Sequence, residues 1–338
     1  MAITQYGDIS PRTAAYAYTE MLKHAEPVLV LGRFGQLKPL PKNKSQTIKF
    51  RRAIPYDPVT SPLVEGVTPS VKGTSFEDVT VTVQQWGDVH GLTDVIEDTH
   101  EDPVLKTQMM LTGEQAAATT EQVIFNVVKG GTSVYYANGA SRAAVNTAIS
   151  LNKQRAVVRA LMRAKAKPIT SVLSPSPNIG TSAVEAGFVA IAHTDLEPDI
   201  RAMAGFVPVA KYGSMKPICP EEIGTVEKVR YILTPDLEPW ADAGGAYGGT
   251  VLSTSGTSAD VYPVLYFGQD AYGITPLKNQ KTKEGNNLAV QPIVINPNSP
   301  NGNDPLGQRG YVGWKCWFAA VRLNETWMAR LEVAASAL

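Results

Sequence analysis

One uninterrupted helical stretch, residues 103–129, constrains the fold of this chain more than any other feature of its sequence. In PVLKTQMMLTGEQAAATTEQVIFNVVK, an apolar or small residue recurs at every third or fourth position: Leu105, Met109, Thr112, Ala116, Thr119, Val123 and Val127. This spacing places these residues on one helix face. With a rise of about 1.5 Å per residue, the helix would be about 40 Å long, over twice the mean helix length. It ends at Gly130 and Gly131, so we expect a rod that is the structural axis of its surroundings.

The stretch GLTDVIEDTHEDP, residues 91–103, precedes this helix and gathers groups that catalysis and metal binding use: Asp94, Glu97, Asp98, His100, Glu101 and Asp102. Zinc hydrolases of the HExxH type need a second histidine one turn later, but position 104 is valine and Pro103 interrupts the helix. A calcium loop needs alternating oxygen ligands followed by a glycine, and this stretch has neither. A carboxylate-metal hydrolase that uses Asp94, Asp98 and His100 remains only as the alternative function.

The same stretch has a structural interpretation through Asp102 and Pro103. Asp102 suits the residue that caps a helix, and Pro103 suits the first helical position, where a missing N–H costs nothing. Negative charge at this end is favoured by the helix dipole by about 0.3–1 kcal/mol per charge. We therefore interpret the cluster as the entrance of the long helix. His100 is then a hydrogen-bonding partner within it or, alternatively, a pH-sensitive contact.

The composition of the chain excludes several classes of protein. With 338 residues, of which 43% are hydrophobic, it can bury one large core or two to three modest ones. Its 31 basic residues balance its 31 acidic ones, so no overall charge favours nucleic acid or an anionic membrane. Cys219 and Cys316 are too few for a disulfide scaffold or a zinc site, which favours a reducing cytosol. The first residues resemble no export signal, and no segment has the roughly 18 apolar residues of a membrane helix.

The first 88 residues indicate an arm followed by a flap. Residues 28–45, VLVLGRFGQLKPLPKNKS, are interrupted by glycine and proline, which predicts an extended arm whose apolar residues pack on another domain or another subunit. Residues 47–54 and 79–86 alternate in polarity and are predicted to be strands. Their connection exceeds the roughly 12 to 15 residues of an ordinary loop, so we expect a long two-stranded flap. Such a ribbon is marginally stable alone, and a neighbouring copy is expected to support it.

Two basic segments are candidate contact surfaces. A helix predicted over residues 151–167 carries three arginines at a spacing of four: Arg155, Arg159 and Arg163. It lies in a tract, residues 122–184, that has no acidic residue. These arginines form a solvated face, a contact with acidic groups of a neighbouring subunit, or a contact with nucleic-acid phosphates. A second basic run, residues 33–52, also lacks acidic residues, and we favour a subunit contact over a DNA contact for it.

Other catalytic motifs are missing from the sequence. It contains no GK dipeptide and no GxSxG, and its glycines at 244, 245, 248 and 249 do not match GxGxxG. Residues 241–260, rich in glycine and serine, predict an exposed loop tip. Strands are predicted at GFVAIAH, VYPVLYFG and AVQPIVIN, and in the aromatic-rich region 310–335. The expected fold class is mixed α+β, and we expect no catalytic residue, cofactor or metal ligand.

Several distinctive phrases run from about residue 30 to residue 315, among them LVLGRFGQLKPLPKNKSQTIKFRR, TDVIEDTHEDPVLK, HTDLEPDIRAMAGFVPV and DPLGQRGYVGWK. On these phrases, and on the order of arm, flap, rod and mixed domain, the chain resembles the major capsid proteins of tailed bacteriophages, which have the Hong Kong 97-type capsid fold. More closely, it resembles the phage N-four-type family. The resemblance implies a shell subunit without catalysis that self-assembles into hexamers and pentamers around double-stranded DNA.

The resemblance also implies a division of the chain. Residues 1–44 would be the arm, 45–88 the extended loop (E-loop), 89–140 with 280–338 the peripheral domain, which includes the spine helix 103–129, and 141–279 the axial domain. Expected partners are other copies, a scaffolding protein and a portal during assembly, packaged DNA by non-specific contact, and a decoration protein as an optional partner, but no membrane. The protein would be made in the bacterial host cytoplasm and located in the virion capsid. The candidate residues for contacts between subunits are Arg33, Phe34, Arg51, Arg52, Trp86, Asp98, His100, Arg155, Arg159 and Arg163.

Overall fold

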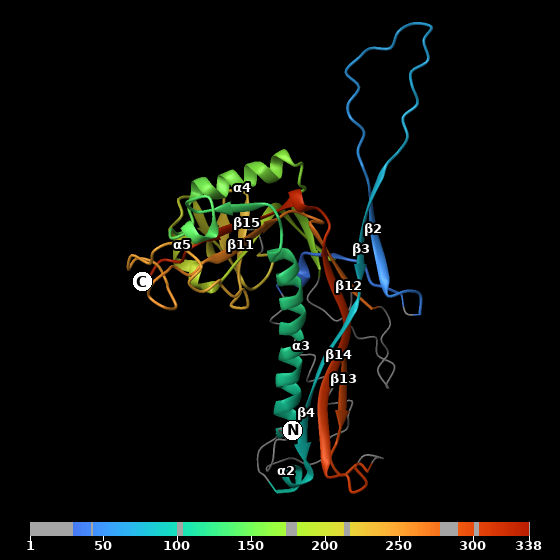
Figure 1. Ribbon diagram of the computed structural model, residues 1–338, viewed down its shortest axis with the longest axis vertical. Helices are drawn as coiled ribbons and strands as arrows, with labels where there is room; N and C mark the ends of the chain where they lie inside the picture. Colours follow the sequence, from blue (N-terminus) through green and yellow to red (C-terminus); the bar gives the residue numbers. More distant parts are fainter. Residues whose placement is uncertain are drawn as a thin grey trace.

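The computed structural model describes residues 30–41, 43–99, 104–173, 181–212, 217–277, 290–300 and 304–337. It has a long leg, a compact domain beside the upper end of that leg, and a hairpin that rises beyond both (Figure 1). With 24% helix and 36% strand, it confirms the predicted α+β class. No helix of the described residues has the length and apolar character needed to cross a membrane.

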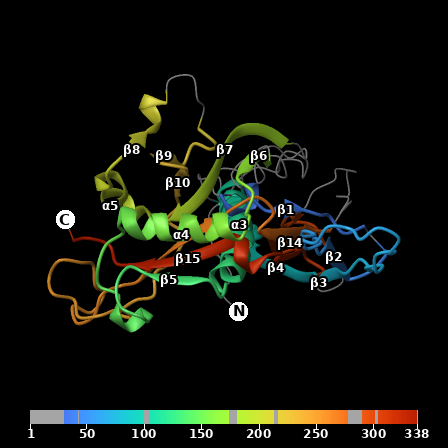
Figure 2. The ribbon, with the colours of Figure 1, turned by 90° about the horizontal axis from the view of Figure 1, so that it is seen from above.

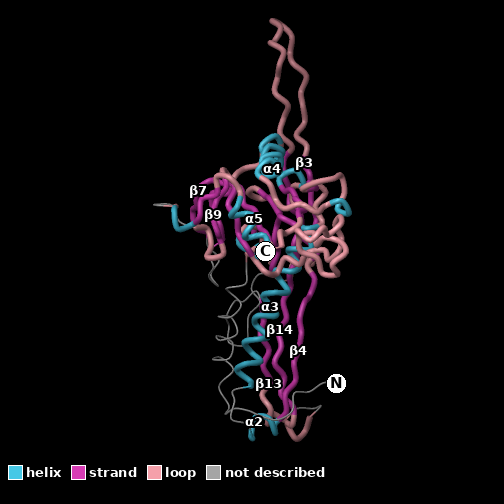
Figure 3. The backbone as a smooth tube through the Cα atoms, turned by 90° about the vertical axis from the view of Figure 1, so that its left-hand side faces the viewer, coloured by secondary structure: helices cyan, strands magenta, loops and turns pink. Residues whose placement is uncertain are grey.

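The leg consists of one long helix against a five-stranded sheet (Figure 3). The helix, α3 (Val104–Lys129), confirms the rod predicted from the sequence. The strands are β4 (Gln84–Thr93), β14 (Arg309–Arg322), β13 (Val290–Ile295), β12 (Tyr272–Pro276) and β1 (Gln36–Leu37). Residues 311–316 of β14 pair with both β4 and β13, so β14 runs between those two strands.

Apolar contacts and one polar bridge hold α3 on the sheet. Leu105 and Met109 join a buried cluster with residues of β4 and β14. Further along, the Gln115 side chain donates to Asp88 Oδ2 at 2.6 Å and accepts from Trp314 Nε1 at 3.1 Å. The buried positions follow the predicted stripe as far as Ala116 and then move to a neighbouring line, namely Ala117, Glu121, Ile124, Phe125 and Val128. This second half of α3 contacts the compact domain and the segment that begins at residue 30 instead of the leg sheet alone.

The compact domain is built on an eight-stranded mixed sheet. In spatial order its strands are β5 (Val134–Tyr136), β15 (Met328–Val333), β11 (Tyr262–Phe267), β7 (Thr181–Ala192), β10 (Val229–Leu233), β9 (Glu222–Val226) and β8 (Phe206–Pro208), and β6 (Ile169–Leu173) pairs with β7. Two helices accompany it, α4 (Leu151–Arg163) and α5 (Glu197–Ala202). The region 310–335, predicted as one strand region, is therefore divided between two sheets as β14 and β15.

The helix α4 covers this sheet and is shorter than predicted. Val157 and Leu161 face inward and join a buried cluster with Phe188 and Tyr231 of the sheet. The helix was expected to continue to residue 167, but Lys165 has a φ of 55°, a left-handed value that ends a right-handed helix. The remaining short elements are the 3-10 turns η3 (Arg142–Ala144), η4 (Thr194–Leu196), η5 (Val209–Lys211) and η6 (Glu325–Trp327), and the helix α2 (Asp94–Thr99).

The hairpin consists of β2 (Thr47–Ala53) and β3 (Phe76–Thr82), which pair in antiparallel register. Its first strand agrees with the prediction for residues 47–54. The second predicted strand, 79–86, is instead divided, because β3 ends at Thr82 and the chain continues into β4 of the leg. Val83 lies at this crossing, where it is buried and donates its N–H to Gln46 O at 2.9 Å. Residues 54–75 extend beyond the paired strands and form no helix or strand (Figure 1).

Residues 30–37 pack inside their own chain. Val30, Leu31 and Phe34 are buried in the core cluster that joins α3 to the compact domain. The 3-10 turn η2 (Leu31–Arg33) is followed by β1, which pairs in parallel with β12. Of the two expectations for the apolar residues of the arm, another domain or another subunit, Val30 and Leu31 therefore agree with the first, because they pack between α3 and the compact domain of their own chain. The rest of the predicted arm, residues 1–29, lies outside the described residues.

The glycine-rich tract 241–260 is only partly an exposed tip. Gly244 and Gly245 lie against the segment that precedes α4, and a Cβ at Gly244 would stand 2.3 Å from Val145 O. Glycine is required there because the backbones approach so closely. Gly248 and Gly249 have positive φ and are exposed, as predicted for a loop tip.

Candidate functional site

The end of the hairpin is the largest group of exposed apolar side chains in the described residues. The described residues include sixteen large apolar side chains that are exposed. Eight of them belong to residues 54–76: Ile54, Tyr56, Val59, Leu63, Val64, Val67, Val71 and Phe76. Val71 is 98% exposed and Val59 is 81% exposed. The segment has three charged residues, Asp57, Glu65 and Lys72. A concentration of apolar surface of this kind marks a contact with another molecule.

The base of the hairpin is held by ion pairs within the chain. Arg51 donates from Nε to Asp78 Oδ1 at 2.7 Å and from Nη2 to Asp78 Oδ2 at 2.8 Å. Its hydrogen bonds hold the pKa of Asp78 below the usual value for a carboxyl group. Arg52 donates to Glu77 Oε2 at 2.7 Å. Both arginines were predicted to contact a neighbouring subunit, and the structure gives each one an acidic partner on the opposite strand of its own hairpin.

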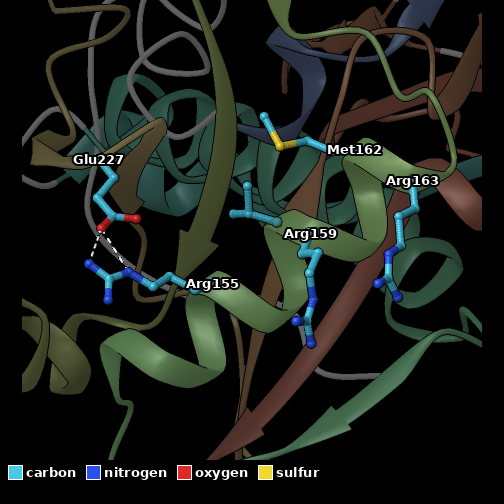
Figure 4. Close-up of a pocket in the computed structure, with 6 residues that line it drawn as sticks. Arg155, Arg159, Met162, Arg163 and Glu227 are labelled. Atoms are coloured by element: carbon cyan, nitrogen blue, oxygen red, sulfur yellow. Dashed lines mark hydrogen bonds and ion pairs between the residues drawn. The ribbon is translucent and has the colours of Figure 1, made fainter.

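The outer face of α4 carries the other basic candidates. Arg155 donates from Nε to Glu227 Oε1 at 2.8 Å, and this hydrogen bond holds the pKa of Glu227 below its usual value. Arg159 and Arg163 form no ion pair with any described residue (Figure 4). Val158 and Met162 lie between the arginines, and together these residues line an open hollow of about 360 Å³. We call this surface, formed by Arg155, Val158, Arg159, Met162, Arg163 and Glu227, the α4 face.

Three predicted contact residues are instead used inside their own chain. Arg33 is 9% exposed and lies 3.8 Å from Glu221. Phe34 is buried, with its ring centroid 5.7 Å from that of Phe267. Trp86 is partly buried and donates from Nε1 to Phe318 O at 3.3 Å. Burial leaves Arg33 and Phe34 little surface for a neighbour, so we do not retain them as candidates, and Trp86 keeps only its exposed part.

The acidic stretch before α3 does not form a metal site in the described residues. Asp94 starts the short helix α2, and its Oδ1 accepts from the N–H of Val95 at 2.8 Å. Asp98 is exposed on the same helix. No group of three or more His, Cys, Asp or Glu residues in the described part of the chain could hold a metal ion. His100 and the expected cap formed by Asp102 and Pro103 lie outside the described residues.

Sequence reasoning missed a buried carboxylate, Glu121, on the inner face of α3. Its Oε1 accepts from the N–H of Leu31 at 2.6 Å and of Val30 at 3.2 Å, so it ties η2 to the long helix. Tyr272 donates to Leu31 O at 2.6 Å from the other side. Burial raises the pKa of Glu121 to about 7. The signal available in the sequence was an acidic residue among apolar ones, one turn before Phe125.

A second missed group joins the carboxyl end of α3 to the compact domain. Glu332 is fully buried on β15 and accepts from Arg142 at 2.8 and 2.9 Å and from Arg330 Nε at 2.8 Å. Arg330 also donates to the carbonyl of Lys129 at the end of α3. The Trp240 ring stacks under Arg142, whose Cζ is 3.5 Å from the ring centroid. We call this group of five residues the joint.

A known protein family matches most of this chain. Residues 76–330 match the model of a family described as phage capsid protein. No curated protein sequence matches the chain.

Three solved structures of phage capsids are similar to this chain in fold. The chain is similar to the capsid of Ralstonia phage GP4, with 15% identity, 92% of each chain covered and a TM-score of 0.67. It is also similar to the Cyanophage Pam1 capsid asymmetric unit, with 13% identity over 100% of this chain and 97% of the other and a TM-score of 0.60. The asymmetric unit of the bacteriophage PhiM1 mature capsid matches at 10% identity over 98% of this chain and 91% of the other, with a TM-score of 0.56. At these identities the likeness establishes a shared fold.

Proposed function

Because the chain belongs to the phage capsid protein family, we propose that its copies assemble into hexamers and pentamers that enclose double-stranded DNA. It is a shell-forming major capsid protein of a tailed bacteriophage with the Hong Kong 97-type fold. It self-assembles into capsomers and is located in the virion capsid. No finding supports the carboxylate-metal hydrolase alternative.

The proposed roles of the parts follow the division expected from the sequence, except that β5 and β15 lie in the sheet of the compact domain, with the axial part, and β12 lies in the leg sheet, with the peripheral part. Residues 45–88 act as an extended loop that reaches a neighbouring copy, and residues 89–140 with 280–338 form the peripheral domain around its spine, α3. Residues 141–279 form the axial domain, with the loop at Gly248 and Gly249 toward the capsomer axis. The projection of the hairpin beyond the body supports the first assignment, and the leg sheet along α3 supports the second (Figure 1).

The single observation that carries this proposal is the exposed apolar end of the hairpin. A two-stranded ribbon is marginally stable alone, and residues 54–76 expose eight large apolar side chains, from 46% exposed for Ile54 to 98% exposed for Val71. A second copy at the hairpin end would cover this surface. The interface candidates that remain compatible with the structure are Arg51, Arg52, Trp86, Asp98, Arg155, Arg159 and Arg163.

Paired substitutions on the hairpin test this assignment. We expect the purified chain to form closed particles, tubes or capsomers in negative-stain microscopy. The variant Val59→Asp/Leu63→Asp replaces two apolar side chains that are 81% and 77% exposed, so it should keep its melting temperature but remain unassembled. The matched control, Thr60→Asp/Ser61→Asp, adds the same charge next to them and should assemble. If Val59→Asp/Leu63→Asp assembled as well as the unchanged chain, the hairpin would not be the contact.

The further partners in this proposal are a scaffolding protein and a portal during assembly in the host cytoplasm, packaged DNA held by non-specific contact, and a decoration protein as an optional partner. Family membership supports the first three. Expression of the chain with and without the neighbouring assembly genes tests them, because shells of uniform size should form only when the scaffolding protein is present.

A further inference from the structure

We infer that the α4 face docks an acidic surface of the adjacent copy in the same capsomer ring. This inference rests on the proposed function and names a second contact between the copies that the hairpin joins. It assigns a partner to a basic face for which the sequence alone left three readings open: solvent, a neighbouring subunit and nucleic acid.

The α4 face is shaped for a partner. Arg159 and Arg163 project from successive turns of α4 with no acidic partner in the described residues (Figure 4). Met162, which lies between Arg159 and Arg163 in the sequence of α4, is 46% exposed and lines the same hollow, so exposed apolar surface adjoins the basic residues. Exposed apolar surface next to arginine is typical of protein contacts, in which methionine and arginine are enriched.

The orientation of the α4 face agrees with that of the hairpin. α4 crosses the side of the compact domain toward which the hairpin rises (Figure 1). Seen from that side, α4 lies over the sheet and the hairpin stands beside it (Figure 2). If the end of the hairpin reaches a neighbouring copy, that copy stands on the side of the α4 face. In a closed ring of identical subunits, each contact joins two different surfaces of the subunit. The surface of the neighbouring copy that faces α4 is therefore a different one from the α4 face.

The charge distribution along the chain supplies a complementary charge outside residues 122–184. Residues 122–184 hold eight of the 31 basic residues and none of the 31 acidic ones. The rest of the chain therefore has 23 basic and 31 acidic residues, a net charge of minus eight. Each copy thus carries both a basic face and an acidic remainder, which is the condition for a head-to-tail contact between identical subunits.

Two features of the α4 face favour a protein partner over DNA. Glu227 lines the same hollow and neutralises Arg155, and its carboxylate would repel a phosphate group. The exposed Met162 offers apolar contact area, which a phosphate backbone does not use. Contact with DNA is therefore an outcome that the experiment must detect separately.

Charge reversal on α4 tests the inference. In Arg159→Glu/Arg163→Glu both substituted side chains are exposed and unpaired within the described residues, so the isolated subunit should melt at the same temperature. We expect the protein concentration needed for assembly, measured by sedimentation and negative stain, to rise on the order of tenfold or more, because two attractive contacts become repulsive. Met162→Asp should have an effect in the same direction, since it places a negative charge on the exposed apolar part of the α4 face. Assembly of both variants at the unchanged concentration would overturn the inference.

The control distinguishes the docking surface from general basicity. Lys165→Glu/Lys167→Glu makes the same change of charge just after α4, at two exposed residues outside the hollow, and should assemble nearly as the unchanged chain does. If both charge-reversed pairs formed normal shells that contained less DNA, the α4 face would be a nucleic-acid contact and the inference would be wrong. Failure of the unchanged chain to form any assembly would instead contradict the proposed function.

Discussion

The hairpin and the joint use charged residues in opposite ways. On the hairpin, Arg51 and Asp78 pair at the surface, where solvent surrounds both groups. In the joint, Glu332 is fully buried between Arg142 and Arg330. A surface pair contributes little to stability but fixes which residues face each other, whereas a buried pair is costly to break. The difference indicates that the joint holds the subunit together, while the surface pairs of the hairpin contribute little to its stability.

The largest effect is expected from breaking the joint. Glu332→Ala removes the buried carboxylate that Arg142 and Arg330 share and leaves these two partly buried guanidinium groups without it. We expect the free energy of unfolding of the unassembled subunit to fall by about 3–5 kcal/mol, as for other buried ion pairs that lose one partner. Denaturant unfolding followed by circular dichroism measures this change. A loss no larger than that caused by Asp78→Ala would remove the distinction between the two regions.

An effect of intermediate size is expected from Glu121, whose contribution to the free energy of unfolding depends on pH. Its pKa is raised from 4.5 to about 7 by burial, so the folded state binds a proton more tightly than the unfolded state. The stabilisation from the protonated form is complete below pH 4.5 and is lost as the pH rises through about 7. The loss amounts to about 3 kcal/mol for a shift of this size.

Glu121→Gln isolates that contribution. The amide oxygen can still accept from the N–H groups of Val30 and Leu31, while the titrating proton is removed. Asp236 lies close enough to raise the pKa of Glu121 and is present in both proteins, so its own titration cancels in the comparison. We expect the variant to lose less stability between pH 5 and pH 8 than the unchanged chain. Identical pH profiles would show that Glu121 is not the titrating group.

The smallest effect is expected from the hairpin pair. Asp78→Ala removes the partner of Arg51, but both groups lie in water, so the midpoint of thermal unfolding should stay unchanged within the error of the measurement. The register of β2 on β3 should loosen, which hydrogen exchange of the amides between residues 47 and 53 would detect. A large fall in the unfolding midpoint would mean that the hairpin stabilises the subunit in the same way as the joint.

Local sequence patterns predicted a helix or strand well where the residues within that element determine its structure. The repeat of apolar residues in α3 and the alternation in β2 depend on near neighbours in the sequence, and both elements were confirmed within one residue at each end. The buried face of α3 was predicted correctly only as far as Ala116. Beyond it the buried residues depend on residues 30–34 and on the compact domain, whose positions no local pattern reveals.

The partners of the candidate contact residues could not be predicted from local patterns either. The sequence identified Arg155 as one of a basic row, but its partner Glu227 is 72 positions away. Arg51 and Arg52 belong to a run, residues 33–52, that has no acidic residue, and the hairpin brings Asp78 and Glu77 opposite them. Exposed residues were therefore recognised by type, while their pairing required the register of strands that are distant in sequence.

The crossing at Val83 has a mechanical consequence. β3 and β4 are consecutive strands of one segment, so a pull on the end of the hairpin is transmitted along the chain into the leg. There β4 is paired with β14 over ten positions, from Thr93 opposite Arg309 to Gln84 opposite Phe318. A force directed along these strands shears all of their hydrogen bonds at once instead of opening them one by one. If a neighbouring copy holds the hairpin, as proposed, tension between the two copies is borne by the longest strand ladder of the described residues.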